Sequence, residues 1–363
     1  MPRVKIFGAG SIGNHLANAA RSKGWDVTVC DVDPASLKRM KQDIYPARYG
    51  KWDDAITLCV SDDAPVGGFD YVFVGTPPDS HIPLARAALK ESPRAILVEK
   101  PLATPDLQGC QELFDEAAAK GIKVFVGYDH VVAPSTAMAG EVLRKEVGEV
   151  QALTVAFREH WQGIFNAHPW LEGPADTYLG FWRRGGGALG EHSHAVNLWQ
   201  HLAHEAGAGR VIEVSAMLDY VEADGASYDR VALLHLKTEK GLVGDVIQDV
   251  VTRPPLKAAR AQGSKGAVEW QCQPSPYTDF VRKISADTVD VQEFSKTRPQ
   301  DFIAELDHIE LAVEKGVKSP ISIERGLDSM LVIAAGHLSA ATGRSVAIDY
   351  AKGYTADALK VAD

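Results

Sequence analysis

The chain contains 363 residues, of which 45% are hydrophobic and 24% charged, and its formal net charge is −10. At ~100–200 residues per domain, this length predicts two domains, or three at most, and the apolar content excludes a disordered chain. The excess of acidic residues argues against a nucleic-acid-binding protein, because such proteins need a basic surface. It also argues weakly against adsorption to anionic membranes, and it says nothing specific about a small-molecule substrate.

Cysteine usage and the first residues are typical of a cytoplasmic protein. The four cysteines, Cys30, Cys59, Cys110 and Cys272, form no C-x-x-C pair, so we interpret them as reduced thiols. Residues 1–7 lead directly into a short strand pattern, and we therefore expect no signal peptide. No apolar run approaches the ~18–20 residues of a membrane span, so we expect no membrane partner.

Short apolar runs alternate with amphipathic stretches in the first third of the chain. The runs are continuous and rich in β-branched residues, as expected for strands covered on both faces. They are Val4–Phe7, Val27–Cys30, Ile56–Val60, Tyr71–Val74, Ala95–Val98 and Val124–Val126. Helical patterns lie at Ser11–Lys23, Asp79–Lys90 and Pro105–Lys120. This alternation predicts an α/β domain, residues 1–127, with a doubly wound parallel sheet of the Rossmann type.

The pattern changes after about Gly127. Longer runs with more alternation follow at Val150–Phe157, Val211–Leu218, Val231–Lys237 and Leu242–Val250. Residues 238–241 between two of them end in glycine and predict a hairpin turn. Long helices are predicted at about Gln300–Lys315 and Ile323–Thr342. We predict a second α/β domain, residues 128–363, with an open and largely antiparallel sheet that serves substrate binding and oligomerisation. Its late helix, 323–342, is expected to pack back on the first domain.

A glycine-rich motif, GAGSIG at residues 8–13, follows the first predicted strand and opens a helix. The first glycine permits the tight turn, the second lets the backbone approach a pyrophosphate, and the third lets helix and strand pack closely. The helix N-terminus offers N–H groups to the phosphates. We predict that Gly8, Gly10, Ser11, Ile12 and Gly13 contact a dinucleotide, because strand and helix flank the motif as that site requires. A structural turn without a ligand is the alternative.

Asp31 ends the second predicted strand, near the ~20-residue offset expected for the acid that binds a ribose 2′-hydroxyl. Its carboxylate would repel a 2′-phosphate, and no arginine follows at once. The sequence therefore predicts NAD as the cofactor, with NADP less favoured. Asp33 either shares this role or caps the helix that starts at Pro34.

Two further motifs follow later strands. GTPPDSH at residues 75–81 follows the fourth strand, and Glu99-Lys100-Pro101 follows the fifth. With the fingerprint glycines, this layout resembles the glucose–fructose oxidoreductase / inositol dehydrogenase family, often called Gfo/Idh/MocA. The resemblance in layout covers nearly the whole chain, including the late helix near Ile323–Thr342. Glu-Lys-Pro after a strand in this order is fairly specific.

The resemblance implies an NAD(P)-dependent dehydrogenase or reductase acting on CH–OH groups. It places the following residues at the cofactor: Thr76, Pro77, His81, Glu99, Lys100 and Pro101. Lys100 would also reach the substrate hydroxyl, where an ammonium group stabilises a developing alkoxide. A cis peptide before Pro101 is implied as well. Without the resemblance, Lys100 is interpreted as a solvated lysine at a strand end, and Thr76-Pro77 as ordinary turn residues.

The family also places a glycine run before a helix that carries an acid and, four residues later, a histidine. Here the run is Gly185–Gly187, but Glu191 replaces the usual Asp and His194 follows only three residues later. We predict catalytic roles for Lys100, His194 and Glu191, with His194 as general base because H-x-x-N to Asn197 keeps the family spacing. Alignment on His194 leaves the role of Glu191 open, and His192 is a rival base. His192 and Asn197 are predicted substrate contacts.

Metal chemistry is not required by this residue set. Several histidines cluster between residues 191 and 204, but no H-E-x-x-H signature is present and hydride transfer with a lysine and a histidine needs no ion. We expect no metal site. Tyr128-Asp129-His130 departs from the Asn or Met followed by Arg of many relatives, and its sequence assigns it no role.

An aromatic segment from Arg158 to Arg184 is predicted to contact substrate. Its candidate residues are Trp161, His168, Trp170 and Arg183, because rings suit the apolar faces of sugars and arginine can clamp an anionic group. An oligomer interface explains the same composition equally well. Together with the family resemblance, the sequence predicts hydride transfer between a secondary alcohol of a sugar, polyol or sugar derivative and the nicotinamide, in a homodimer or homotetramer. The alternatives are a redox-neutral enzyme that retains NAD, a non-catalytic sugar-responsive regulator, and reduction of an imine or enamine.

Overall fold

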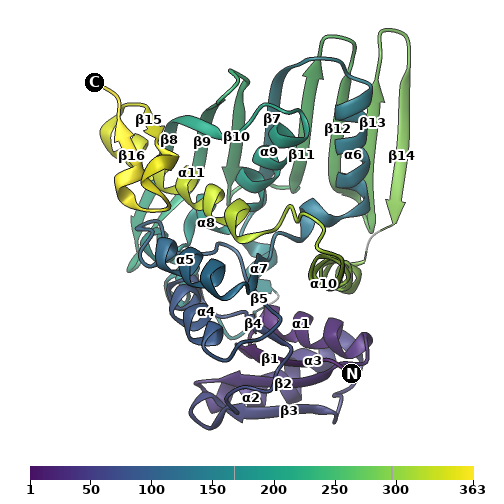
Figure 1. Ribbon diagram of the computed structural model, residues 1–363, viewed down its shortest axis with the longest axis vertical. Helices are drawn as coiled ribbons and strands as arrows, with labels where there is room; N and C mark the ends of the chain where they lie inside the picture. The colour runs from purple at the N-terminus through teal and green to yellow at the C-terminus, as the bar shows by residue number, and fades with distance from the viewer. Residues whose placement is uncertain (167, 296) are drawn as a thin grey trace.

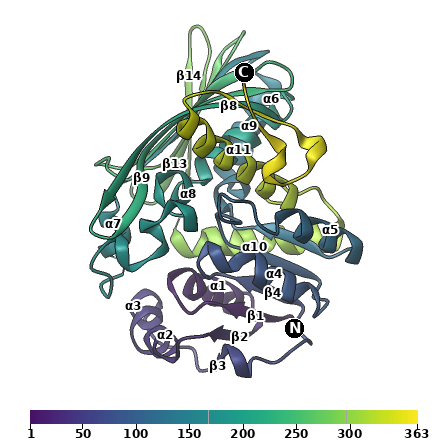
Figure 2. The same cartoon turned by 90° about the vertical axis from the view of Figure 1, so that its left-hand side faces the viewer.

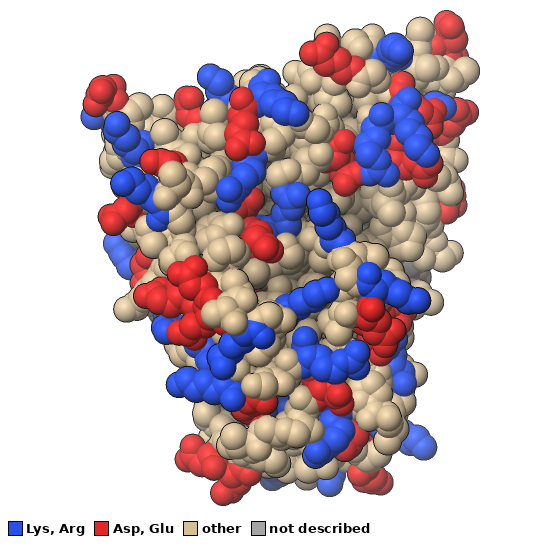
Figure 3. All heavy atoms as spheres, in the orientation of Figure 1, with Lys and Arg blue, Asp and Glu red and all other residues tan. Residues whose placement is uncertain are grey.

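The protein is built on two sheets, the smaller one at the bottom of Figure 1 and the larger one above it. This computed structural model describes residues 1–166, 168–295 and 297–363. No helix in those ranges is both long enough and apolar enough to cross a membrane. Figure 3 shows acidic and basic side chains interspersed over one face, without a continuous basic surface.

The first sheet contains six parallel strands in the order β3-β2-β1-β4-β5-β6, as predicted for a Rossmann domain. The strands are β1 (Arg3–Phe7), β2 (Asp26–Asp31), β3 (Ile56–Val60), β4 (Tyr71–Val74), β5 (Ala95–Val98) and β6 (Lys123–Val126). Every residue of β4 and β5 is buried, which explains their continuous apolar sequences. The strand order reverses between β1 and β4, and ligands bind at the carboxyl ends of the strands at such a point.

Helices cover both faces of this sheet. They are α1 (Ser11–Ser22), α2 (Pro34–Arg39), α3 (Tyr45–Tyr49), α4 (His81–Leu89) and α5 (Cys110–Lys120), with a π-helical turn η1 (Met40–Ile44) between α2 and α3. The predicted start of α5 at Pro105 is wrong, because Leu107 and Gly109 have φ values of 60° and 75° that no α-helix accommodates. Likewise a 3₁₀ turn, η3 (Pro78–Ser80), precedes α4 where the prediction began the helix at Asp79.

The second sheet contains ten strands in the order β14-β13-β12-β11-β7-β10-β9-β8-β15-β16. In chain order they are β7 (Val150–Arg158), β8 (Val211–Ala223), β9 (Ala226–Thr238), β10 (Val243–Asp249), β11 (Leu256–Gly263), β12 (Ala267–Ser275), β13 (Thr278–Ile284), β14 (Val289–Ser295), β15 (Val346–Ile348) and β16 (Leu359–Val361). In the described ranges, β7 and β10 pair in parallel and the other neighbours pair antiparallel. The open, largely antiparallel sheet and the β9–β10 hairpin are confirmed.

One face of the large sheet is covered by α6, α9 and α11, as Figure 1 shows. The helices of this half are α6 (Pro134–Lys145), α7 (Gln162–Asn166), α8 (Gly187–Glu191), α9 (His194–Glu205), α10 (Arg298–Lys315) and α11 (Ile323–Thr342). The short 3₁₀ turns are η2 (Ser61–Asp63), η4 (Asp129–Val132), η5 (Pro174–Asp176), η6 (Tyr178–Gly180), η7 (Trp182–Arg184), η8 (Tyr350–Lys352) and η9 (Ala356–Ala358). The opposite face exposes apolar side chains such as Met217, which is 72% exposed.

Two late helices connect the halves. Helix α10 lies beside α1 of the first sheet (Figure 2), although it follows the last long strand of the second. Just before α11, the amide of Val126 in β6 donates to the carbonyl of Ile321 at 2.9 Å. Gly326 in the first turn of α11 leaves its backbone against Val126, where a Cβ would approach Val126 Cγ2 to 2.4 Å. These contacts fix the C-terminal end of β6, and the segment after it, against the second half.

Candidate active site

The glycine-rich loop has the geometry that its sequence predicts. Gly8 has a φ of +102°, and a Cβ there would lie 2.6 Å from the Gly75 carbonyl oxygen. A Cβ on Gly13 would lie 1.9 Å from the Gly8 carbonyl oxygen, so α1 and the loop meet without room for a side chain. A Cβ on Gly10 would meet nothing within 4 Å. The open space at Gly10 is where a pyrophosphate has to approach the backbone.

The N-terminus of α1 suits an anion. Its first turn contains no acidic residue, and Gly10 provides no side chain to cap the free N–H groups. Arg48, in α3, donates from Nη1 to the Ser11 carbonyl and from Nη2 to Ser11 Oγ, both at 2.8 Å. A guanidinium therefore lies at the phosphate end of the predicted cofactor site. Sequence analysis missed Arg48, because it lies 37 residues from Ser11 and belongs to no motif.

Asp31 lies at the carboxyl end of β2 and is held against the same loop. One carboxylate oxygen accepts from the Ala9 amide at 2.7 Å and the other from the Asp33 amide at 2.9 Å. Each oxygen keeps lone-pair capacity for a ribose hydroxyl. Asp33 accepts from the Ala35 amide and from Ser36 Oγ, both at 2.9 Å, and so acts as the N-cap of α2. The open loop, the helix N-terminus and Asp31 together fit NAD.

Replacing Asp31 with Asn should weaken NAD binding by about 10- to 100-fold, because charge-assisted hydrogen bonds to the ribose diol are worth roughly 1.5–3 kcal/mol. The preference for NAD over NADP should shrink, since the repulsive charge is removed. Asp33→Asn is the matched control, because asparagine still caps α2. Fluorescence titrations of the three proteins measure this. An equal loss in Asp33→Asn would instead support the shared role left open by the sequence.

His81 joins the two motifs that follow β4 and β5. Its Nδ1 lies 2.9 Å from the Pro101 carbonyl oxygen and its Nε2 lies 2.6 Å from the Thr76 carbonyl oxygen. The side chain is fully buried, and burial lowers its pKa to about 4. His81 therefore links the two motifs through its two ring nitrogens. The sequence had predicted that His81 contacts the cofactor. The Lys100–Pro101 peptide is cis, as the resemblance implied.

Lys100 and Glu191 meet although they lie 91 residues apart. Lys100 Nζ donates to the Glu191 carbonyl oxygen at 2.8 Å and to Glu191 Oε2 at 3.1 Å. Lys100 follows β5, and Glu191 ends α8. Both side chains are mostly enclosed, with 13% and 18% of their surfaces exposed. Two of the three predicted catalytic residues are therefore an ion pair at the carboxyl end of the first sheet.

The glycine run positions α8 for this contact. Gly185 and Gly187 have φ values of +89° and +76°. A Cβ on Gly185 would lie 2.8 Å from Pro78 Cβ, and one on Gly187 would lie 1.9 Å from Asp229 Oδ1. Asp229, fully buried in β9, accepts from the Leu189 amide of α8 at 2.7 Å. The run therefore lets the backbone pass between the first sheet's loops and β9, which brings Glu191 to Lys100.

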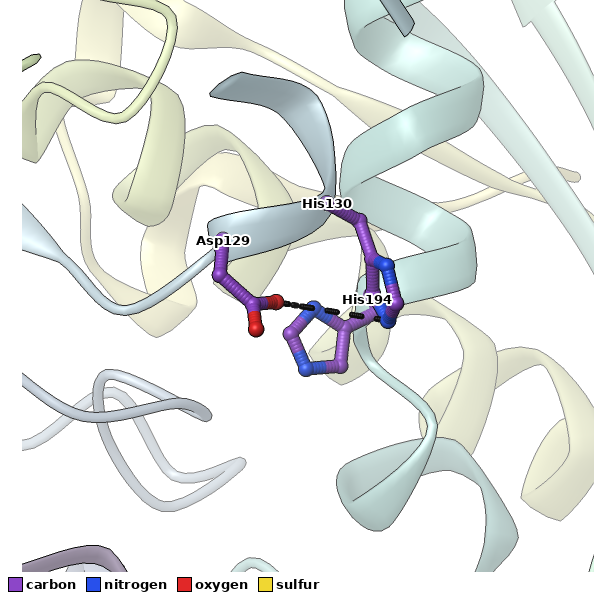
Figure 4. A group of neighbouring side chains, drawn as sticks. All are labelled: Asp129, His130 and His194. Carbon is purple, nitrogen blue, oxygen red and sulfur yellow. Dashed lines mark ion pairs between the residues drawn. The ribbon is translucent and has the colours of Figure 1, made fainter. Parts of the chain in front are cut away.

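His194 lies in a cluster that sequence analysis did not assemble (Figure 4). Its Nδ1 is 3.8 Å from Asp129 Oδ1, and His130 Nε2 is 4.0 Å from the same oxygen. The ligand atoms of the three side chains lie within 4.8 Å of one another, a spacing that would also suit a metal ion. Burial first, and then the charge of His130, hold the pKa of His194 well below its usual range. His194 is therefore neutral at physiological pH.

Two neighbours of His194 are enclosed. His192 is 4% exposed, burial lowers its pKa to about 4, and its Nε2 has no hydrogen-bond partner in the described part of the chain. Asn197 is 2% exposed, and its amide donates to Ser329 Oγ of α11 at 3.2 Å. Asn197 therefore lies between α9 and α11. The sequence had predicted that Asn197 contacts the substrate.

The side chains of the aromatic segment lie in several different environments. Trp161 packs in a small apolar cluster with its ring 4.7 Å from that of Tyr228. His168 donates from Nδ1 to the Ile164 carbonyl oxygen at 2.6 Å and lies beside Trp170. Trp170 reaches the first half, where the Arg39 guanidinium lies 5.4 Å from its ring.

Arg183 lies over the ring of Trp182 at 4.2 Å, and Trp182 stacks on His337 at 4.5 Å. Within the described ranges, no recorded contact joins any of the four predicted aromatic-segment residues to Lys100, Glu191 or His194. Packing against Tyr228 buries the Trp161 indole. The substrate contacts of Trp161, His168, Trp170 and Arg183 remain predictions.

The Rossmann strand order, the glycine loop and Asp31 define an NAD-binding α/β protein whose second half supplies further polar groups to the cleft. The chain belongs to the Gfo/Idh/MocA oxidoreductase family. A family model described as the NAD-binding Rossmann fold of that oxidoreductase family matches residues 2–128, and one described as its C-terminal alpha/beta domain matches residues 145–348. No curated protein sequence matches the chain significantly.

Solved structures share the fold over almost the whole chain. An oxidoreductase from Agrobacterium radiobacter, in complex with NAD⁺, L-tartaric acid and magnesium, is 18% identical with a TM-score of 0.76, and the match covers 95% of this chain and 98% of that one. The aldose–aldose oxidoreductase from Caulobacter crescentus, complexed with glycerol, is 19% identical with a TM-score of 0.75 and coverages of 96% and 99%. Levoglucosan dehydrogenase with NADH and L-sorbose is 18% identical with a TM-score of 0.75 and coverages of 95% and 98%.

Proposed function

We propose that the protein transfers a hydride between a secondary alcohol of a sugar, polyol or sugar derivative and the nicotinamide of NAD. The observation that carries this proposal is the meeting of the Lys100–Glu191 pair with the carboxyl end of the NAD-binding sheet. An ammonium group that is largely enclosed stabilises the charge of an alkoxide more strongly than water does. NAD, when bound, supplies the hydride acceptor.

The protein's own residues perform positioning and proton transfer in this proposal. His194 is neutral and accepts the hydroxyl proton, while Lys100 donates a hydrogen bond to the oxygen that becomes negative. Glu191 holds the Lys100 ammonium at the cleft. Loss of the hydroxyl proton leaves negative charge on the oxygen, and this charge promotes departure of the hydride from the carbon that carries the oxygen.

Three solved relatives by fold support the substrate class. Their structures contain L-tartaric acid, glycerol or L-sorbose, each of which offers hydroxyl groups on adjacent carbons. We also propose that the protein works in the cytoplasm as a homodimer or homotetramer. The open face of the large sheet supports self-association, because Met217 and Leu233 pair there with apolar side chains exposed. Residues 1–127 are proposed as the NAD domain and 128–363 as the substrate domain.

A steady-state screen for NADH tests the proposal. Purified protein is mixed with NAD and a panel of polyols, aldoses, sugar acids and sugar phosphates, and NADH is followed by absorbance and fluorescence. We expect sustained NADH production with one chemical class and weaker production when NADP replaces NAD. NAD binding without net NADH from any compound would favour the redox-neutral enzyme or the regulator instead.

A further inference from the structure

Asp129 and His130 lie on the turn that follows β6, and His194 begins α9, so the cluster lies close to the boundary between the two proposed domains. Figure 4 shows both imidazole rings turned toward the Asp129 carboxylate. Asp129 is buried to more than nine-tenths, and its oxygen Oδ1 lies 3.8 Å from His194 Nδ1 and 4.0 Å from His130 Nε2. The Asp129 carboxylate therefore lies in an enclosed place beside the predicted general base, where little solvent screens its charge.

Glu191 is not the acidic partner of His194. Its carboxylate is bonded to Lys100, and α8 ends between the two residues, so they do not share one continuous helix. His194 Nδ1 is shielded from solvent and has no hydrogen-bond partner within the described ranges. The carboxylate that faces this nitrogen belongs to Asp129. If the distance between His194 Nδ1 and Asp129 Oδ1 shortened by about 1 Å, it would reach the ~2.9 Å of an N–H···O hydrogen bond.

We propose that Asp129 is the positioning residue for His194: its carboxylate accepts the Nδ1 proton and so leaves Nε2 with the lone pair that receives the substrate proton. This inference rests on the proposed function for the direction of proton transfer. Neutral imidazole carries one proton, so the partner of one nitrogen decides the chemistry of the other. An acid on a turn after β6 thereby replaces the acid that the sequence pattern led us to expect in the helix before His194.

The surrounding charges favour a carboxylate in this place. The groups that face His194 are His130 and Asp129 from η4, Lys100 after β5, Lys257 in β11 and the Tyr128 ring at 5.6 Å. Lys100 and Lys257 both oppose protonation of His194, whereas Asp129 favours it. Asp129 therefore stabilises the imidazolium that forms during turnover. The same two ammonium groups oppose a bound cation, which is why we prefer this role to a metal site.

His130 supports the cluster through packing of its ring and anchoring of its backbone. Its ring contacts Phe157 edge to face with centroids 5.3 Å apart, and its centroid lies 4.7 Å from that of His194. The Thr136 hydroxyl donates to the His130 carbonyl at 2.6 Å and so anchors the turn to α6. Asp129 is thus held by a turn that is packed on both sides.

Nitrogen-15 NMR of histidine-labelled protein bound to NAD tests the assignment without needing a substrate. The His194 signals are identified by their loss in His194→Gln. We expect the Nδ1–H tautomer in the wild type and a shift toward Nε2–H in Asp129→Asn, whose amide can donate to Nδ1. Asp129→Glu should restore the wild-type tautomer. Asp245→Asn is the matched control, because Asp245 Oδ1 in β10 accepts from Nδ1 of the exposed His235 in β9 at 2.6 Å.

Where turnover is measurable, Asp129→Asn should lower kcat by about 10²- to 10⁴-fold, as expected when a base is held in the wrong tautomer. The acid limb of the pH profile should move to lower pH, because removing the anion lowers the pKa of His194 further.

Three results would each overturn the proposal: an Nε2–H tautomer in the wild type, an unchanged tautomer in Asp129→Asn, or one equivalent of a divalent metal that is lost with Asp129. Failure of the NADH screen with the expected tautomers would reject only the proposed function.

Discussion

Lys100→Ala should lower kcat by about 10²- to 10³-fold, the range typical for loss of one donor to a developing oxyanion. The ammonium is held 3.1 Å from Glu191 Oε2, and both side chains are largely enclosed, so its charge acts through little solvent. Removing it also leaves the Glu191 carboxylate without this partner. NAD affinity should change far less than kcat, because Gly8–Gly13 and Asp31 lie at the other end of the cofactor site.

The measurement for Lys100 combines steady-state kinetics with an NAD titration of the same preparation. Lys120→Ala, at the end of α5, is the control for loss of a lysine from a surface helix. Lys100→Arg separates charge from geometry, since a guanidinium keeps the charge but not the compact donor. Near-normal turnover in Lys100→Ala would reject the catalytic assignment.

Gly13→Ala should destabilise the protein by about 1–3 kcal/mol, as overpacking of a tight contact does. The added methyl would lie 1.9 Å from the Gly8 carbonyl oxygen, so α1 and the loop have to separate. NAD affinity should fall by at least ~10²-fold, because each hydrogen bond to a charged group is worth roughly 1.5–3 kcal/mol and several amides move.

Gly10→Ala provides the matched comparison within the same loop. A Cβ at residue 10 meets nothing within 4 Å, and its φ of −76° suits alanine. This variant should unfold at nearly the wild-type temperature yet bind NAD weakly, because the methyl occupies the approach of the pyrophosphate. Thermal unfolding and NAD titration of both variants check the pair. Equal stability of Gly13→Ala and wild type would contradict the close packing described for the loop.

Most of the first domain was predictable from sequence because its signals are local. The strands β4 and β5 are continuous apolar runs, and each glycine of the motif lies where a tight turn, a close contact or a ligand requires one. In the second domain, the strand Leu256–Gly263 has the sequence LKAARAQG, whose alanine, lysine and arginine favour helix. It forms a strand because β7 and β12 supply hydrogen bonds on both sides, which is tertiary context that no local pattern contains.

The candidate site likewise contains some features that local motifs predict and others that depend on tertiary packing. Lys100 and Glu191 were predicted from motifs, and the structure brings them together. The Asp129–His194 contact joins two segments that are far apart in the sequence and depends on how η4 packs against α9, so no local sequence spacing predicts it. Trp161 shows the converse, because a tryptophan in a polar aromatic segment is equally compatible with substrate contact and with the packing against Tyr228 that the structure shows.

A single-turnover reaction tests the central claim most directly. Protein saturated with NAD is mixed rapidly with the polyols, aldoses and sugar acids of the panel, and the absorbance of enzyme-bound NADH is followed. The account predicts a burst of NADH that approaches one equivalent per active site with one chemical class and that is nearly abolished in Lys100→Ala. Absence of any burst across the panel, in protein shown to bind NAD, would contradict hydride transfer from an alcohol at this site.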